Sequence, residues 1–185
     1  MEIPDLIVLT LALGTVFGQV FLAVLGILWI YQRKIKKEPF THDLWIWLKE
    51  RSLVVGFFVA FASVVGSLLL SEVANYPPCL LCWIQRAFMY PQVIILGIAF
   101  FKKKYHWYKP ILVLSGIGAI IAAYHYFIQI DPNAPSICTS AANSCTSSPF
   151  FYFGYISIPI MSITAFALLL VISKAMHTKT KENKK

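Results

Sequence analysis

The chain of 185 residues is 58% hydrophobic and only 13% charged, with a formal net charge of +8. A soluble domain carries roughly a quarter charged residues, so this composition excludes a single water-soluble core and favours a chain surrounded largely by lipid. The positive charge could also suit nucleic acid, but the basic residues flank apolar runs instead of forming a basic face, so we expect no nucleic-acid partner.

Five apolar runs are long enough to cross a bilayer, which takes about 20 residues in a helix. Backbone groups in lipid must be paired within their own segment, so each run predicts a helix and not a strand. The first run follows an acidic start, Met-Glu-Ile-Pro-Asp, which is unlike the positively charged start of a cleavable signal peptide. In chain order the predicted spans are Leu6–Tyr31, Leu53–Leu70, Leu80–Phe101, Ile111–Ile130 and Phe150–Ile172.

The basic residues are distributed very unevenly among the loops. Fifteen of the sixteen Lys and Arg residues lie between the first and second runs, between the third and fourth, or after the fifth. Lys and Arg near the ends of spans mark the cytoplasmic side. We therefore expect a multi-pass protein of a bacterial cytoplasmic (inner) membrane, with its N-terminus and two loops outside and its C-terminus inside.

All four cysteines fall on the side predicted to be outside, where disulfides persist. Cys79 and Cys82 form a Cys-x-x-Cys motif after two prolines, at the expected start of the third helix. The partial positive charge of a helix start favours a thiolate there. Cys138 and Cys145 share the next outer loop, Asp131–Pro149.

Three polar residues are expected inside the membrane near the outer surface. The sixteenth basic residue, Arg86, lies four residues after Cys82 and so on the same helix face. An intramembrane Arg costs a few kcal/mol and usually marks a functional site, although a shallow one can also extend to the headgroups. His125 and Gln129 share a face of the fourth helix. His125 is either a hydrogen-bonded core histidine or a donor and proton carrier at the same site.

Two other interpretations of the cysteines are weaker. A four-cysteine zinc site usually repeats a short spacing twice, whereas the second pair here is Cys138-x6-Cys145, so we expect no metal site. Two inert structural disulfides would leave Arg86 unexplained.

The remaining interpretation is redox chemistry. Thiol–disulfide exchange can pass electrons between two cysteine pairs on one side of the membrane. The sequence has no haem-attachment or dinucleotide-binding motif, and no cysteine is expected on the cytoplasmic side. By exclusion, the electrons leave to a lipid-soluble two-electron acceptor, and a quinone beside Cys82, Arg86 and His125 fits because a cation stabilises both thiolate and reduced quinone oxygen.

These motifs together resemble one known family. Cys79-Leu-Leu-Cys82 followed by Trp-Ile-Gln-Arg86 is similar to the C-x-x-C-x-x-x-R element of the DsbB/BdbC disulfide bond formation proteins, and so are the segment around His125 and the following loop cysteines. The resemblance covers Ser52–Ser173. It implies a four-helix bundle that reoxidises a DsbA-like thioredoxin-fold partner and passes the electrons to ubiquinone or menaquinone.

The resemblance also implies individual roles. The partner attacks Cys138, Cys145 exchanges with Cys79, and Cys82 meets the quinone. The residues expected to contact or flank the quinone are Cys82, Arg86, His125 and Gln129. The short spacing of the loop cysteines leaves open which of them the partner attacks.

The predicted organisation is an N-terminal anchor and basic loop (1–51), a DsbB-like four-helix catalytic bundle (52–173) and a basic tail (174–185). The first helix is extra to the four-helix pattern and has no predicted role beyond anchoring. The alternatives are a quinone-linked enzyme of the vitamin K epoxide reductase type, a membrane scaffold with structural disulfides, and a metal transporter or metallochaperone. The sequence does not identify the quinone, the partner or the oligomeric state.

Overall fold

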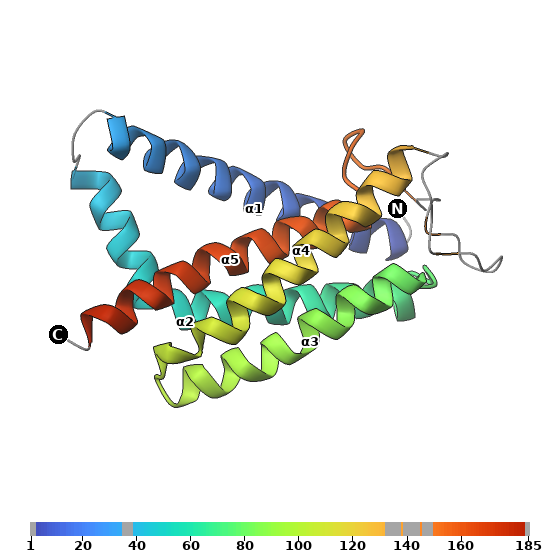
Figure 1. Cartoon of the computed structure of the whole chain (residues 1–185). Coiled ribbons are helices and arrows are strands. Elements are labelled where there is room, and N and C mark those ends of the chain that lie inside the picture. The colour runs from blue at the N-terminus through green and yellow to red at the C-terminus, as the bar shows by residue number, and fades with distance from the viewer. Residues whose placement is uncertain (1–2, 35–38, 132–137, 139–144, 146–149, 184–185) are drawn as a thin grey trace.

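The computed structural model describes residues 3–34, 39–131, 138, 145 and 150–183, and these contain no strand. Five helices form one bundle (Figure 1), and all five are long and apolar enough to cross a membrane. The prediction of an all-α membrane protein with five spanning helices is confirmed. The helices are α1 (Ile3–Lys34), α2 (Pro39–Leu68), α3 (Leu80–Phe101), α4 (Tyr108–Ile130) and α5 (Ile158–Glu182).

The core lies where α2, α3, α4 and α5 pack together, and it contains the fully buried Leu96, Phe166 and Leu169. The outer faces of the helices remain apolar. Phe101 is 82% exposed and Ile120 is 72% exposed, and many other large apolar side chains along the helices are exposed as well, as expected where the surrounding solvent is hydrocarbon.

Two helices differ from the prediction by more than one turn. Helix α2 begins at Pro39, well before Leu53, and α5 runs from Ile158 to Glu182 instead of from Phe150 to Ile172. The segment before α5 instead forms a tight turn, closed by a bridge between Tyr152 and Ile156. The extra helical turns of α2 and α5 lie against one another.

Two ion pairs join these added turns. Lys49 of α2 pairs with Glu182 of α5, and Lys179 of α5 pairs with Glu50 of α2. Exposed pairs of this kind contribute only about 0–1 kcal/mol each. The residues expected to form a basic tail are thus helical as far as Glu182, because charged side chains outside the lipid can extend a helix when they are paired.

The connection from α2 to α3 places the first cysteine pair. Helix α2 continues into a π-helical turn, η1 (Leu69–Val73). Asn75 follows with φ 57°, a left-handed conformation that Asn tolerates better than most residues. The chain then reverses through the two prolines into α3. A shorter 3-10 turn, η2 (Tyr105–Trp107), joins α3 to α4.

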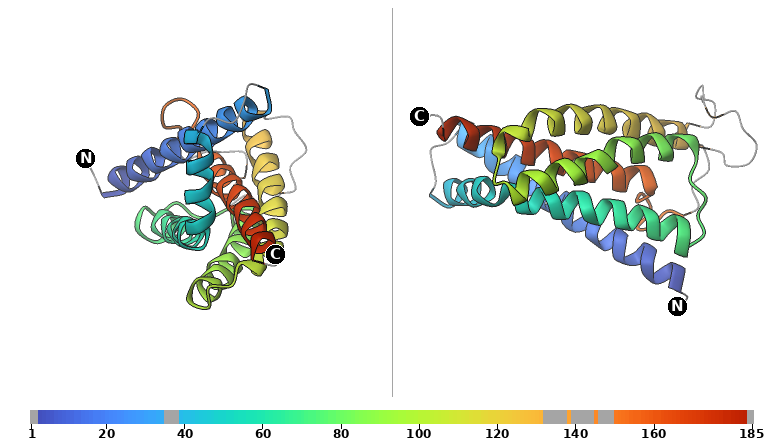
Figure 2. Two further views of the ribbon diagram at one scale, coloured as in Figure 1. Left: turned by 90° about the vertical axis from the view of Figure 1, so that its left-hand side faces the viewer. Right: turned by 90° about the horizontal axis from the view of Figure 1, so that it is seen from below.

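Helix α1 crosses the other helices obliquely (Figures 1 and 2). Its buried residues Val8, Ala12 and Thr15 recur at helical spacing and face the bundle. Gly18 lies against α5, where a Cβ would meet Thr164 Cγ2 at 3.1 Å. The extra helix is therefore packed onto the bundle.

The start of α1, the start of α3 and the end of α4 lie at one end of the bundle, and the end of α5 lies at the other (Figure 1). This arrangement brings the two cysteine pairs to one end. The assignment of that end to the outside remains a prediction from the basic loops.

The contact between α4 and α5 gives a test of the packing. A Cβ added at Gly118 would lie 2.4 Å from the buried ring of Phe166, whereas a Cβ at Gly116 meets nothing within 4 Å. We expect Gly118→Ala to destabilise the protein by about 1–3 kcal/mol through overpacking. Gly116→Ala should be neutral or stabilising by up to about 1 kcal/mol, because alanine has the higher helix propensity.

Thermal unfolding in detergent measures both variants. Equal unfolding temperatures for the two would contradict the described α4–α5 packing.

Candidate redox site

The Cys-x-x-Cys motif forms the first turn of α3. Cys79 is the N-cap in an extended conformation, and its sulfur accepts a hydrogen bond from the backbone N–H of Cys82 at 3.4 Å. Both cysteines are free thiols, with their sulfurs 3.0 Å apart. Cys79 is buried and Cys82 is half-buried. The helix start thus holds two sulfurs close enough to oxidise to a disulfide with a small adjustment.

His125 of α4 lies directly against this pair. Its Nε2 is 3.6 Å from the Cys79 sulfur, and its Nδ1 is 2.9 Å from Nε2 of Gln85 on α3. An amide nitrogen can only donate, so Nδ1 of His125 accepts. The proton of the neutral ring is then on Nε2, where it faces Cys79. Gln85 therefore selects the histidine tautomer that donates to sulfur.

These contacts favour the thiolate form of Cys79. This residue precedes the membrane-spanning part of α3. The hydrogen bond from the Cys82 thiol, and then the one from His125, lower the pKa of the Cys79 thiol, while burial raises it and is outweighed. Cys79 is therefore prepared to act as a nucleophile or as a leaving group.

Cys138 and Cys145 form a disulfide, and it lies beside the first pair. Cys145 is only 1% exposed and belongs to one apolar cluster with Cys79 and Ile128, against which Cys82 and Cys138 also pack. The structure thus brings all four predicted cysteines together. The rest of the loop Asp131–Pro149, apart from Asp131 at its start, lies outside the described residues.

Arg86 points into the bundle. It is 7% exposed, its Nε donates to Ser67 Oγ at 2.8 Å, and its Nη2 donates to the Ser67 carbonyl at 2.7 Å. The guanidinium also lies 5.2 Å from the centre of the Trp83 ring. A buried charge needs such partners to offset its desolvation. These bonds hold the guanidinium against α2. The alternative in which Arg86 extends to the lipid headgroups did not include this contact.

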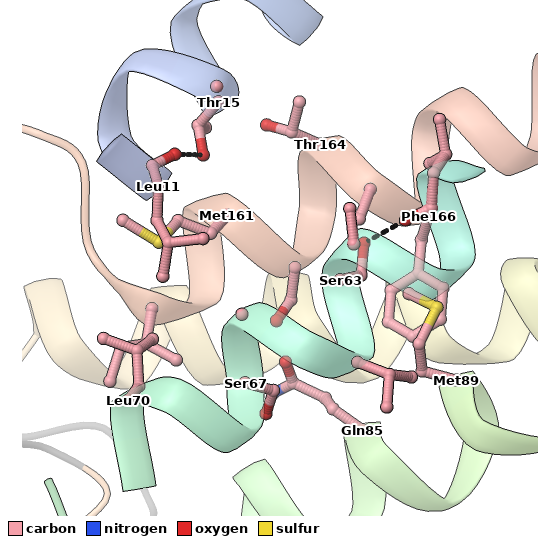
Figure 3. A pocket seen from close by; sticks show the side chains of 18 of the residues that line it. Leu11, Thr15, Ser63, Ser67, Leu70, Gln85, Met89, Met161, Thr164 and Phe166 are labelled. Carbon is pink, nitrogen blue, oxygen red and sulfur yellow. Dashed lines mark hydrogen bonds between the residues drawn. The ribbon is translucent and has the colours of Figure 1, made fainter. Parts of the chain in front are cut away.

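A cavity of about 280 Å³ opens beside Cys82 and Arg86. Its walls come from α1, α2, α3 and α5, and Figure 3 shows Leu11, Ser67, Gln85 and Met161 around it. Gln85 Oε1 is buried without a hydrogen-bond partner among the described residues. The cavity therefore combines apolar walls with a cation, a sulfur and an unsatisfied acceptor.

The predicted site residues divide into two groups. Cys82 and Arg86 line the cavity, whereas Cys79 and His125 lie on the side of the loop disulfide. Gln129 does not line the cavity, and its buried Oε1 has no partner in the described part of the chain. Its predicted contact with a quinone stays a prediction, as does that of His125, which does not line the cavity either.

Sequence reasoning missed Gln85 and Ser67. Gln85 is polar within an apolar span, and that signal could have identified it. Ser67 could not have been found, because serine is common in spanning helices and its contact with Arg86 depends on how α2 packs against α3.

The same atoms could also hold a metal ion. The ligand atoms of Cys79, Cys82 and His125 all lie within 4.8 Å of one another. Cysteine spacing alone did not reveal this group, because the third ligand comes from another helix. Thiolates are needed for such binding, and a disulfide between the two cysteines would remove them.

The fold and the site together define a membrane-embedded thiol–disulfide protein with two adjacent cysteine pairs. The family model for disulfide bond formation protein DsbB matches residues 49–176, and the chain belongs to this family. The match begins within α2, so α1 lies outside it. No solved structure matches the chain significantly.

Curated relatives agree with the family. The SPbeta prophage-derived disulfide bond formation protein B of Bacillus subtilis (strain 168) is 41% identical over 69% of this chain and 86% of its own length. A probable disulfide formation protein of Oceanobacillus iheyensis is 41% identical over 76% of this chain and 91% of its own. Disulfide bond formation protein C of Bacillus subtilis (strain 168) is 39% identical over 64% and 87%, respectively.

The contact between His125 and Cys79 gives a prediction about pH. The pKa of Cys79 is lowered, so its thiolate is present above that lowered pKa and is lost as the pH falls through it. Replacing His125 with Phe removes one cause of the lowering. We therefore expect the thiolate titration to shift to higher pH.

Thiolate absorbance near 240 nm, followed against pH in reduced protein with Cys138 and Cys145 replaced by Ser, measures the shift. His106→Phe, which changes a histidine next to Trp107 at the other end of α3, is the matched control. An unchanged titration in His125→Phe would mean that the histidine does not stabilise the thiolate.

Proposed function

We propose that this protein is a thiol:quinone oxidoreductase that reoxidises a DsbA-like thioredoxin-fold partner outside the cytoplasm of a bacterium and passes the electrons to ubiquinone or menaquinone. One observation carries the proposal. Cys82 lies on a cavity inside the membrane-spanning bundle, whereas Cys79, three residues earlier, packs in one cluster with the loop disulfide. A single dithiol thus faces a protein donor on one side and a membrane acceptor on the other.

The electron flow is a sequence of two-electron exchanges. The partner's dithiol reduces the Cys138–Cys145 disulfide and becomes a disulfide. The loop dithiol then reduces a disulfide between Cys79 and Cys82 by thiolate attack, which restores the loop disulfide. Oxidation of the Cys79–Cys82 dithiol back to its disulfide would then deliver two electrons and two protons to the acceptor, so that the net result is one new disulfide in the partner.

A bound quinone would supply the two-electron, two-proton acceptor, and the residues present suit it. A cavity of roughly 150 Å³ accommodates benzene, so the 280 Å³ here is sufficient for a substituted ring. The bonds to Ser67 use two of the five N–H donors of Arg86, and the side chain lines the cavity. Gln85 Oε1 can accept from a reduced hydroxyl.

The protein's own groups would act at two positions. The Nε2–H of His125 stabilises negative charge on the Cys79 sulfur, which helps this sulfur leave when Cys138 attacks Cys145 in a mixed disulfide between Cys145 and Cys79. The Arg86 cation, held against Ser67, stabilises charge on Cys82 and on the acceptor oxygen without reorganising.

Quinone reduction by the purified protein in detergent tests the proposal. With a reduced thioredoxin-fold dithiol protein as donor, quinone absorbance should fall in step with partner thiols, and Cys82→Ser should abolish both changes. Reduction of neither ubiquinone nor menaquinone would eliminate the proposal. Metal analysis of the same reduced preparation would then show whether Cys79, Cys82 and His125 serve a metal ion instead.

Arg86 gives a separate prediction. A lysine keeps the charge but loses the two-point contact with Ser67, and losing a preorganised donor of this kind lowers turnover by about a hundredfold or more. We expect Arg86→Lys to show such a loss with quinone, and Arg51→Lys, an exposed arginine of α2, to show none. Equal turnover in both variants would mean that the guanidinium geometry does not matter to the reaction.

A further inference from the structure

Helix α1 lies outside the family match, yet it forms part of the cavity wall. Thr10, Leu11, Gly14 and Thr15 line the cavity together with Cys82 of α3. The helix therefore lines the cavity of the redox site, and its expected role as an anchor does not explain this position. Figure 3 shows Leu11 and Thr15 across the cavity from Ser67 and Gln85.

The contacts of α1 fix it in this position. A Cβ on Gly66 of α2 would lie 2.7 Å from Leu11 Cδ2, so Leu11 lies directly over the glycine. On the other side, Gln19 Nε2 donates to Thr164 Oγ1 of α5 at 3.3 Å, and Gln19 Oε1 accepts from the Tyr155 hydroxyl at 2.7 Å. Close packing at a glycine and hydrogen bonds between helices are the usual means of helix association in lipid.

The exposed lining residues locate the mouth of the cavity. Three residues that line it are also exposed on the surface of the bundle: Thr10 and Gly14 of α1, and Ala62 of α2. A Cβ on Gly14 would meet no atom within 4 Å. The opening therefore lies between α1 and α2, within spans that are long and apolar enough to be in the membrane.

We propose that α1 and α2 form a lateral portal through which the quinone enters from the membrane, so that α1 sets which acceptors reach Cys82 and Arg86. This inference rests on the proposed function. The mouth is formed by small side chains, which leave room for an apolar tail, and the inner end carries a sulfur, a cation and a carboxamide that suit a polar head. One molecule with both parts, an isoprenoid quinone, matches both ends of the cavity.

A pair of glycine variants on α1 tests the portal. Gly14→Leu adds a side chain at the mouth. Gly26→Leu makes the same change on the same helix, where a Cβ also meets nothing within 4 Å and which is not part of the cavity lining. We expect Gly14→Leu to weaken quinone binding and to raise the KM for quinone by about tenfold, because the added side chain fills space that the ligand needs. Thiol–disulfide exchange between the partner and the loop disulfide should be unchanged.

Quenching of tryptophan fluorescence measures the Kd of the oxidised protein for quinone in detergent. This readout is independent of turnover. Gly26→Leu should match the wild type in Kd, KM and unfolding temperature. A short-chain ubiquinone carrying an azide on its isoprenoid tail should, on illumination, label peptides from α1 and the facing part of α2.

The outcomes separate the two proposals. Equal Kd values in Gly14→Leu and Gly26→Leu, with a wild type that binds and reduces quinone, would overturn the portal and leave the enzyme intact. Labelling confined to α3, α4 and α5 would also overturn it. A wild type that neither binds nor reduces quinone would overturn the proposed function and the portal with it.

Discussion

The pairing of Arg86 with Ser67 is the contact on which the site depends. A guanidinium inside a membrane bundle must be satisfied by protein, and here two bonds to a single residue of α2 do this. The same bonds fix α3 against α2 one turn below Cys82. They also lie just before the π-helical turn of α2, and such turns are frequent at functional sites. The position of the cation, the sulfur and the cavity follows from this one anchor.

The three-residue separation of Cys79 and Cys82 gives the pair two different surroundings. Cys79 is the N-cap, still outside the helix, and meets His125 and the cluster that contains the loop disulfide. Cys82 has completed almost a turn and faces the cavity. A dithiol across a helix start can therefore connect the cluster of the loop disulfide to the cavity without any movement of the helix.

Much of this arrangement could be predicted from the sequence, and the reasons are physical. Lipid requires long apolar helices, so the five spans could be predicted from the apolar runs of the sequence. An arginine inside a span usually marks a functional site, so Arg86 could be predicted as well. The predicted start of α2 and the predicted end of α5 were wrong because polar helical turns beyond the lipid depend on pairing between helices, such as Lys49 with Glu182. Gln85, Ser67 and the position of α1 over the cavity were missed because they depend on side chains meeting across helices, which no periodicity in one segment reveals.

The burial of Cys79 has a consequence for electron leakage. With 7% of its surface exposed, and with the loop disulfide in the same cluster, this sulfur has little contact with small dissolved thiols and peroxides. In the proposed cycle, electrons reach the inner pair chiefly by passing through the loop pair. Cys82 is half-buried, and it packs against the same cluster as well as lining the cavity. In that cycle, the burial of Cys79 would limit over-oxidation of the thiols and would keep reducing equivalents from bypassing the partner protein.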